Sequence, residues 1–414
     1  MTFAKELQAA VLYGIFSGVA LPLIPIVARR IGMSAAGIAA MVTMQFVGAL
    51  FGIVVGHQAD RRRKMPFVVL PNLVSRGLIA LLAFARTPVA YLVVVSLFFL
   101  LTNLGGPAYS SIMRTNYSDG NRGRLMGNIR IVIVAVSAVF SLFAGIILGA
   151  DERLVRWLFP VASVFGVLSS LAFSRIRVRR APDLPADSAR PSFRESLRVV
   201  RRNGPFLAFM GILFLCVFPD KLGVSLEPIW LVDTLRLSYR GASILLGTVV
   251  SAVSIVAYFL WARALKRRNG FAVLSVVVFF YAARFAALAV ARTEIQLLPM
   301  SVFSGLANAG WDLVPIFCFI GIAEPAHFSL YVGISTTLFG IRGIFGPSIG
   351  TLLYSSGALS IPGIFWMIAG LVACGGVLLY AFSRRQGARA AAGTRLGAHG
   401  PPPPRVTSGN LFDG

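Results

Sequence analysis

Residues 34–57 read SAAGIAAMVTMQFVGALFGIVVGH and contain no Lys, Arg, Asp or Glu. The next seven residues, QADRRRK, are mostly charged, and a second apolar run, residues 66–85, follows them. A helix needs about 20 apolar residues to cross about 30 Å of hydrocarbon, because each residue adds about 1.5 Å. This stretch therefore predicts two membrane-spanning helices joined by a short basic loop.

The same alternation of apolar runs and polar breaks repeats along the whole chain. The chain is 57% hydrophobic and 13% charged, whereas roughly a quarter of the residues of a soluble domain are charged. We therefore expect an all-α polytopic membrane protein with twelve transmembrane helices. They are expected near residues 7–28, 34–57, 66–85, 88–110, 126–149, 154–174, 205–231, 241–262, 270–291, 296–321, 328–353 and 361–382.

A charged, proline-containing segment, residues 175–204, divides these runs into two sets of six. The pattern predicts an N-terminal six-helix bundle over residues 1–174, a cytoplasmic linker, and a C-terminal six-helix bundle over residues 205–383. Residues 384–414 are basic, proline-rich and of low complexity, so we expect a disordered cytoplasmic tail.

The formal charge of +24 comes from basic residues that fall in the gaps between apolar runs. Such residues prefer cytoplasmic loops beside anionic lipid, and this placement argues against nucleic-acid binding. The bias puts both termini on the cytoplasmic side. Arginine far outnumbers lysine, which is typical of GC-rich bacterial genomes. We therefore expect the protein in the plasma membrane of a bacterium, that is, its inner membrane. We also expect it to be a monomer.

The two halves match each other at a nearly constant offset. Pro25-Ile26 falls on Pro228-Ile229, Arg62-Arg63-Lys64 on Lys266-Arg267-Arg268, and Asn103 on Asn308. Agreement on one offset indicates an internal duplication, which is typical of transporters whose halves move around a central site.

The loop Gly56-His57-Gln58-Ala59-Asp60-Arg61-Arg62-Arg63-Lys64 resembles the G-x-L-A-D-R-x-G-R-K signature of the major facilitator superfamily. Gly56, Asp60 and Arg61 match the signature, and Arg63 stands where its second glycine is usual. A second stretch, Arg122 to Gly127, is similar to the R-G-R-x-x-G sequence of the same family. The resemblance implies two pseudo-symmetric six-helix bundles and transport by alternating access. We also expect Asp60 to lie near the start of the helix at Phe328–Leu330, where unpaired N–H donors and a partial positive charge favour a carboxylate.

Other functions find little support in the residues. No lysine follows a glycine, so the chain has no phosphate-binding loop for ATP. The three histidines lie in loops or in the tail, and the three cysteines have no metal-ligand spacing. We expect neither an enzyme nor a metal or cofactor site.

Ionisable residues inside predicted spans are the natural site candidates, because each costs about 2.5–3.5 kcal/mol at a helix centre. Eight residues qualify: Arg76, Arg130, Asp220, Lys221, Glu227, Arg284, Asp312 and Arg342. Asp220 and Glu227 are seven residues apart and should share a helix face, while Lys221 points elsewhere. Structural pairing is expected for Arg76 and Arg284.

The spans that line the central cavity in the family also carry helix-breaking prolines and polar residues here. On the tenth span a small, polar stripe is formed by Gly305, Asn308, Asp312 and Pro315, with Trp311 beside it, and Asn103 lies on the fourth span. Interrupted helices in both halves indicate a midplane binding site. The alternative for such stripes is close helix packing, which is also the interpretation for Gly340, Gly343, Gly346 and Gly350 on the eleventh span.

Asp312 and Arg342 fall at similar depths on neighbouring spans, so they are expected to pair near the bilayer middle. In this hypothesis Asp312 couples transport to a proton gradient, and the Asp220/Glu227 face is the second candidate. A permanent structural ion pair is the alternative.

The predicted function is secondary transport of a small organic solute. Five of the eight charges are basic, which favours a neutral or anionic substrate. With the first span taken as 7–28, no carboxylate falls in spans one to six, and this argues against a cationic-drug exporter. A transport-inactive sensor or scaffold and a proton-driven efflux pump for drugs or amphiphiles remain alternatives.

Overall fold

The computed structural model describes residues 2–61, 64–117, 119–178, 198, 201–322 and 328–397. Within these ranges the chain is helical and has no β-strand. Nine helices there are long and apolar enough to cross a membrane, and two shorter apolar helices are Ala35–Phe51 and Pro88–Leu104. The all-α membrane fold is thus confirmed, while the count of twelve spans stays a prediction.

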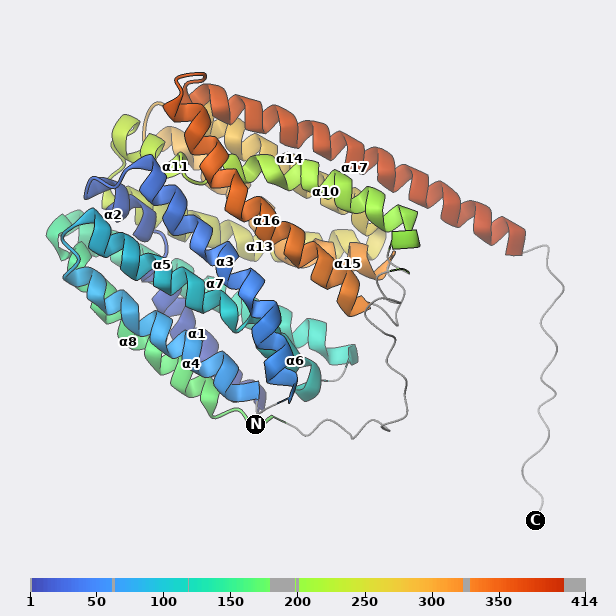
Figure 1. Ribbon diagram of the computed structural model, residues 1–414, viewed down its shortest axis with the longest axis horizontal. Helices are drawn as coiled ribbons and strands as arrows, with labels where there is room; N and C mark the ends of the chain where they lie inside the picture. Colours follow the sequence, from blue (N-terminus) through green and yellow to red (C-terminus); the bar gives the residue numbers. More distant parts are fainter. Residues whose placement is uncertain are drawn as a thin grey trace, which may run out of the picture.

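The helices of the N-terminal half pack mainly on one another. They are α1 (Thr2–Ala20), α2 (Ile24–Arg30), α3 (Ala35–Arg61), α4 (Lys64–Leu78), η1 (Ile79–Ala83), α5 (Pro88–Leu104), α6 (Gly106–Asn116), α7 (Asp119–Ala150), η2 (Glu152–Leu154) and α8 (Val155–Ser174). Helix α1 packs on α7 and α8, α3 packs on α5, and α4 packs on α5 and α8. This half is blue to green in Figure 1.

The C-terminal half is built in the same way. Its helices are α10 (Gly204–Gly223), α11 (Glu227–Ile229), η3 (Trp230–Thr234), α12 (Tyr239–Gly241), η4 (Ala242–Val249), α13 (Val250–Arg267), α14 (Gly270–Val290), η5 (Ile295–Leu297), α15 (Leu298–Ile320), α16 (Phe328–Ser355) and α17 (Ile361–Gly397). Helix α14 packs on α15 and α17, and α10 packs on α16 and α17.

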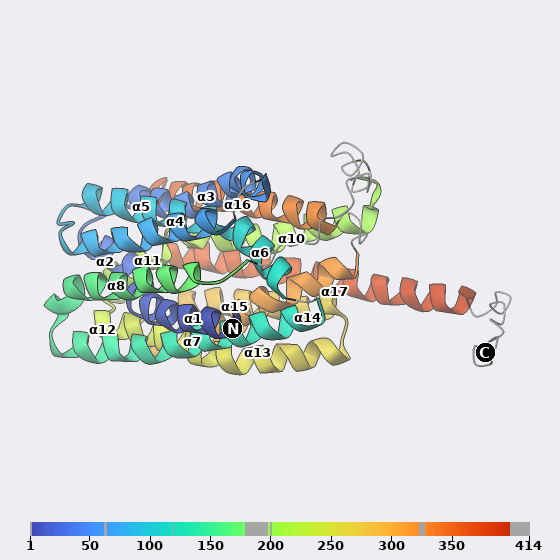
Figure 2. The same cartoon turned by 90° about the horizontal axis from the view of Figure 1, so that it is seen from below.

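Helix α17 corrects the predicted start of the tail. The tail was expected to be disordered from residue 384, but the helix continues to Gly397 and projects beyond the other helices (Figure 2). Alanine and arginine, which are frequent in this stretch, are good helix formers. Residues 398–414 and most of the predicted linker, residues 179–197, lie outside the described residues, so the limits of the two bundles stay a prediction.

Several of the predicted helix breaks are present. Helix α1 ends at Ala20 and α2 begins at Ile24, around Pro22 and Pro25. One residue, Gly105, separates the end of α5 from the start of α6, and α6 has a proline in its first turn. Proline has no N–H for the helical hydrogen bond, which favours these interruptions. Helix α15 differs, because it runs through Pro315 without a break.

The two halves meet along two helix interfaces. Helix α3 packs on α16, and α7 packs on α13 and η4. A Cβ built on Gly343 would lie 2.0 Å from the ring of Phe46 on α3, and one on Gly350 would lie 2.0 Å from the carbonyl oxygen of Leu222 on α10. The glycines of α16 therefore form a close-packing surface, as expected from the sequence.

The bundle has two distinguishable ends. At one end, here called the α11 end, α2 contacts α11 and η3; it is at the left in Figure 1. At the opposite end, the linker end, Lys5 Nζ donates to the carbonyl oxygen of Arg175 at 2.9 Å. There too, Asn203 Nδ2 donates to the carbonyl oxygen of Ile322 at 3.1 Å. The N-terminus and both sides of the linker thus share one end of the molecule.

Candidate functional site

Asp312 of α15 joins the two halves through an arginine of α7. Arg130 Nη2 lies 2.8 Å and Arg130 Nε lies 3.0 Å from Asp312 Oδ2. The hydroxyl of Tyr258, on α13, donates to the same oxygen at 2.7 Å. The side chains of Arg130 and Asp312 are 50% and 36% exposed, so water reaches this ion pair.

Asp312 and Arg342, predicted as alternating partners, do not contact each other in this structure. Arg342 is only 2% exposed, and its Nη1 donates to the carbonyl oxygen of Leu213, on α10, at 3.1 Å. Its Nε is buried and has no hydrogen-bond partner in the part of the chain that the structure describes. Two residues at equal depth on neighbouring helices can point in different directions around their helix axes. Arg342 faces α10 rather than α15.

Asp220 and Glu227 meet at one guanidinium. Arg284 Nη1, on α14, lies 3.6 Å from Asp220 Oδ1, and Arg284 Nη2 contacts Glu227 Oε2. Lys221 Nζ lies 2.6 Å from Asp220 Oδ2. Lys221 was expected to point away from the face that carries Asp220, but its flexible side chain bends back and reaches that carboxylate. All four side chains are at most 16% exposed. Asp220 and Glu227 thus share Arg284 as an ion-pair partner. This is the structural pairing that was expected for Arg284.

Asn308 and Trp311 lie beside this cluster. The hydroxyl of Tyr281, on α14, donates to Asn308 Oδ1 at 3.1 Å, and its ring meets that of Trp311 edge to face at 6.3 Å. A cavity of about 110 Å³ lies here. It is lined by Cys216, Val217, Asp220, Lys221, Val278, Tyr281, Trp311 and Phe339. Asn103 is not part of any such cluster, since its Nδ2 donates to the carbonyl oxygen of Phe99 on its own helix.

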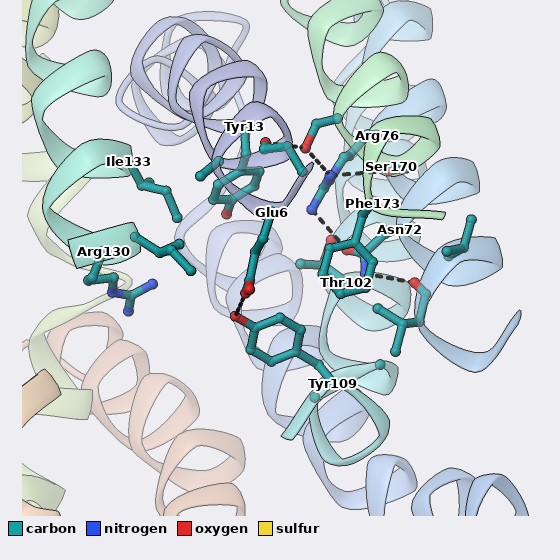
Figure 3. Close-up of a pocket in the computed structure, with 18 residues that line it drawn as sticks. Glu6, Tyr13, Asn72, Arg76, Thr102, Tyr109, Arg130, Ile133, Ser170 and Phe173 are labelled. Atoms are coloured by element: carbon teal, nitrogen blue, oxygen red, sulfur yellow. Dashed lines mark hydrogen bonds between the residues drawn. The ribbon is translucent and has the colours of Figure 1, made fainter. Parts of the chain in front are cut away.

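A larger cavity of about 340 Å³ lies in the N-terminal half, among α1 and α4 to α8 (Figure 3). Glu6 lines it and is 2% exposed. Its carboxylate accepts hydrogen bonds from the hydroxyls of Tyr109, at 3.1 Å, and Tyr117. The sequence interpretation missed Glu6 because the first span was taken to begin at residue 7, whereas α1 begins at Thr2.

Arg76 enters the same cavity from α4 (Figure 3). Its Nη1 donates to Ser169 Oγ at 3.0 Å and its Nη2 to Asn72 Oδ1 at 3.2 Å. Its guanidinium lies 4.6 Å from the ring centroid of Tyr13. The expected pairing is thus met by hydrogen bonds to neutral groups, and none of the ion pairs in the described part of the chain involves Arg76.

At the α11 end one further ion pair joins the two halves, and a second lies inside the N-terminal half. Arg29 on α2 contacts both carboxylate oxygens of Asp233 on η3. Arg30 Nη1 lies 2.9 Å from Glu152 Oε2, and its Nη2 donates to the carbonyl oxygen of Leu237 at 2.7 Å. Asp233 and Glu152 are 40% and 48% exposed, so these contacts are accessible to water.

The side chains of the predicted loop signature, Gly56, Asp60 and Arg61, lie outside the part of the structure that can be described, as do those of Phe328–Leu330. The backbone of α3 continues to Arg61. The contact expected between Asp60 and the start of α16 therefore stays a prediction. No cluster of three or more His, Cys, Asp or Glu that could hold a metal occurs within the described ranges.

Comparison with known proteins agrees with this architecture. The solved structures that share the fold include three transporters. A mutant of the nucleoside transporter NupG has a TM-score of 0.67 at 14% identity over 92% of this chain and 99% of that chain. A bacterial homologue of the human lysosomal transporter Spinster, inward-facing and unoccupied, has 0.64 at 16% identity over 97% and 98%. An auto-inhibited peptide transporter of the POT family has 0.67 at 12% identity over 92% and 96%.

These identities establish similarity of fold alone. No curated protein matches the chain in sequence. The family model described as Major Facilitator Superfamily matches residues 8–311, which is most of the chain. Together with the helical membrane fold, this match shows that the chain belongs to the major facilitator superfamily.

Proposed function

We propose that the protein is a secondary transporter that moves a small organic solute across the membrane by alternating access. The proposal includes coupling to a proton gradient, a monomeric state, and a bacterial inner membrane with the linker end in the cytoplasm. The observation that carries it is the type of contact between the halves. The ion pairs between the halves, Arg29–Asp233 and Arg130–Asp312, are partly exposed, whereas the pairs inside the C-terminal half are buried.

Alternating access requires contacts that break and re-form during each cycle. An exposed ion pair contributes about 0–1 kcal/mol, so separating Arg29 from Asp233 costs little. In this proposal the α11 end is closed in the present state, and a rocking motion of the halves opens it. The interfaces of α3 with α16 and of α7 with α13 supply the surfaces about which the halves turn.

Asp312 is the proposed proton-coupling residue, with Arg130 in the role first assigned to Arg342. Its partner belongs to the other half, so a rocking motion that parts them leaves the carboxylate free to bind a proton. Asp220 and Glu227 fit this role less well, because both are buried and their cations belong to the same half. Tyr258 stays with Asp312 on the C-terminal side and can hold either protonation state.

Transport in proteoliposomes tests the proton step. Asp312→Asn should abolish gradient-driven accumulation of the solute while leaving its binding intact, and any remaining flux should not respond to pH. Tyr258→Phe is the matched control, since it removes one hydrogen bond and keeps the carboxylate. Accumulation that still follows the proton gradient in Asp312→Asn would exclude Asp312 and leave the Asp220/Glu227 face as the candidate.

Cross-linking tests alternating access independently. Arg29→Cys and Asp233→Cys, combined with Cys374→Ala to remove the exposed native thiol, place two thiols across the α11 end. A short bifunctional thiol reagent with a cleavable linker should stop flux, and cleavage should restore it. Flux that persists in the cross-linked protein contradicts opening at this end. Each single-cysteine variant treated with the same reagent is the control.

A further inference from the structure

The 340 Å³ cavity of the N-terminal half is lined by two groups of opposite charge, Glu6 from α1 and Arg76 from α4 (Figure 3). They form no ion pair with each other, and neither takes part in any other ion pair within the described ranges. The hydrogen-bond acceptors of Arg76 are neutral and include Ser169, Ser170 and Asn72. Ionisable residues inside a membrane bundle are costly, and those without a partner of opposite charge are the first candidates for a solute site.

Both groups keep hydrogen-bonding capacity for a ligand. Arg76 Nη2 has two N–H donors and one acceptor among the described residues, Asn72 Oδ1 at 3.2 Å. Each carboxylate oxygen of Glu6 accepts one hydrogen bond, from Tyr109 or from Tyr117, and keeps a second lone pair. Glu6 is only 2% exposed, so a ligand reaches it beside Tyr109, whose hydroxyl oxygen can also accept a hydrogen bond and which lines the same cavity.

The two charges lie at different levels along α1. Glu6 and Tyr13 are seven residues apart on this helix, so their Cα atoms are about 10 Å apart along its axis at 1.5 Å per residue. The guanidinium of Arg76 lies 4.6 Å from the ring centroid of Tyr13, at the level farther from Glu6. A ligand that reaches both groups must therefore be extended, with its own charges several bonds apart.

The third charged residue of the lining is Arg130, which already has a counter-charge. Its Nη2 and Nε both contact Asp312, and Asp312 is not part of the lining. The charges that remain for a ligand are one negative, on Glu6, and one positive, on Arg76. An anion alone would leave Glu6 without a partner, and a cation alone would leave Arg76 without one. A solute that carries both charges satisfies both groups.

We propose that this cavity binds an extended zwitterion, with its carboxylate at Arg76 and its ammonium group at Glu6 and Tyr109, and that this zwitterion is the transported solute. Its class is a primary amine and a carboxylate joined by a chain of several atoms, such as an ω-amino acid or a dipeptide. Tyr13 and Phe173 add aromatic surface for the middle of the molecule. The cavity volume lies in the range of roughly 300–1,000 Å³ that is typical of small-molecule sites.

The role of the zwitterion as solute rests on the proposed transport function, but its binding does not. Binding is therefore measured on the purified full-length protein in detergent, without a gradient, by isothermal titration calorimetry and by the thermal unfolding temperature. The main probe is 6-aminohexanoate. Hexanoate lacks the ammonium group, hexylamine lacks the carboxylate, hexanamide is uncharged, and glycine is a zwitterion too short to span the site.

We expect 6-aminohexanoate to raise the unfolding temperature and to bind at least about tenfold more tightly than each of the other four compounds, because each of them leaves one charged group without a partner. Equal affinity for hexanoate and 6-aminohexanoate would reject the zwitterion. Equal affinity for glycine would reject the extended form. The absence of any response to 6-aminohexanoate overturns the proposal.

Two charge-removing variants separate binding from a structural role. Glu6→Gln should abolish the preference for 6-aminohexanoate over hexanoate, and Arg76→Gln should abolish its preference over hexylamine. A purely structural role would weaken all the compounds alike and leave these ratios unchanged, and unchanged ratios would contradict the proposal. Arg76→Lys keeps the charge and should keep the preference, which covers the case in which Arg76→Gln does not fold. Gly370→Ala, on α17, is the control and should retain both ratios.

Proteoliposome flux separates the site from the transport function. Binding of 6-aminohexanoate without flux of any zwitterion would contradict the transport of this solute and leave the site standing. Flux of another solute by a protein that does not bind 6-aminohexanoate would contradict the site and leave the transport function standing.

Discussion

The ion pairs between the halves differ from those inside the C-terminal half in one physical respect, their contact with water. Arg130–Asp312 and Arg29–Asp233 have side chains that are 23–50% exposed. The side chains of Asp220, Glu227 and Arg284 are only 10–16% exposed. Water screens the first group and keeps each pair weak, whereas the second group has lost its hydration and depends on its partners.

This difference indicates which parts of the protein move. A contact that must break in every cycle cannot be strong, because its energy adds to the barrier between conformations. A charge that stays inside one half can be buried, since its partner moves with it. Variants at the buried pair, at the interface between the halves and at the exposed pairs should therefore differ in the free energy of unfolding, with the largest change at the buried pair.

Glu227→Gln should have the largest effect. It leaves Arg284 buried, with the longer contact to Asp220 as its remaining ion pair and a hydrogen bond to Ser304, and breaking a buried pair from one side costs about 3–5 kcal/mol. Thermal unfolding of the purified protein should show a strongly destabilised variant. The double variant Glu227→Gln with Arg284→Gln should recover much of the loss, and a double variant as unstable as the single one would show that the pair is not the cause.

Gly343→Ala should have the next largest effect. The added Cβ would overlap the ring of buried Phe46 across the interface between the halves, and overpacking costs about 1–3 kcal/mol. Gly370→Ala in α17 is the matched control, because no atom lies within 4 Å of its Cβ position. Unfolding temperatures of both variants provide the measurement, and equal values would argue against tight packing at Gly343.

A double-mutant cycle on Arg130 and Asp312 should give a coupling energy below about 1 kcal/mol, since both side chains are well exposed. The cycle uses Arg130→Gln and Asp312→Asn, with denaturation followed by circular dichroism. The same cycle on Glu227 and Arg284 should give a larger value. If the two coupling energies are equal, burial does not separate the two groups of ion pairs.

Asp233→Asn should change stability least, by less than about 0.5 kcal/mol, but it should shift the conformational equilibrium. Spin labels at Arg153→Cys and Thr234→Cys, both exposed positions at the α11 end, report the separation of the halves by pulsed electron resonance. The variant should show more of the longer distances than the parent. Identical distance distributions would indicate that Arg29–Asp233 does not hold this end closed.

Much of the fold followed from residue patterns along the chain. Apolar run length predicted the helices, and prolines predicted the breaks near Pro22 and Pro107. The start of the first span shows the limit of that approach. Hydropathy falls gradually at a helix end, so a boundary at residue 7, five residues after the start of α1 at Thr2, placed Glu6 outside the span. It concealed a carboxylate that lines the larger cavity.

The sequence by itself determined that the chain is a helical membrane protein, because length and polarity along each helix are local properties. The superfamily was indicated by the resemblance of the loop at residues 56–64 and is shown by the family match over residues 8–311. The sequence also singled out the ionisable residues, since the free-energy cost of placing each of them in lipid depends mainly on its depth in the bilayer. Which of them meet was decided only by the tertiary structure. Asp312 contacts Arg130 across 182 positions in sequence, because the rotation of each helix about its axis is set by packing against its neighbours. The same packing turned Arg342 away from Asp312 and left it buried beside Leu213.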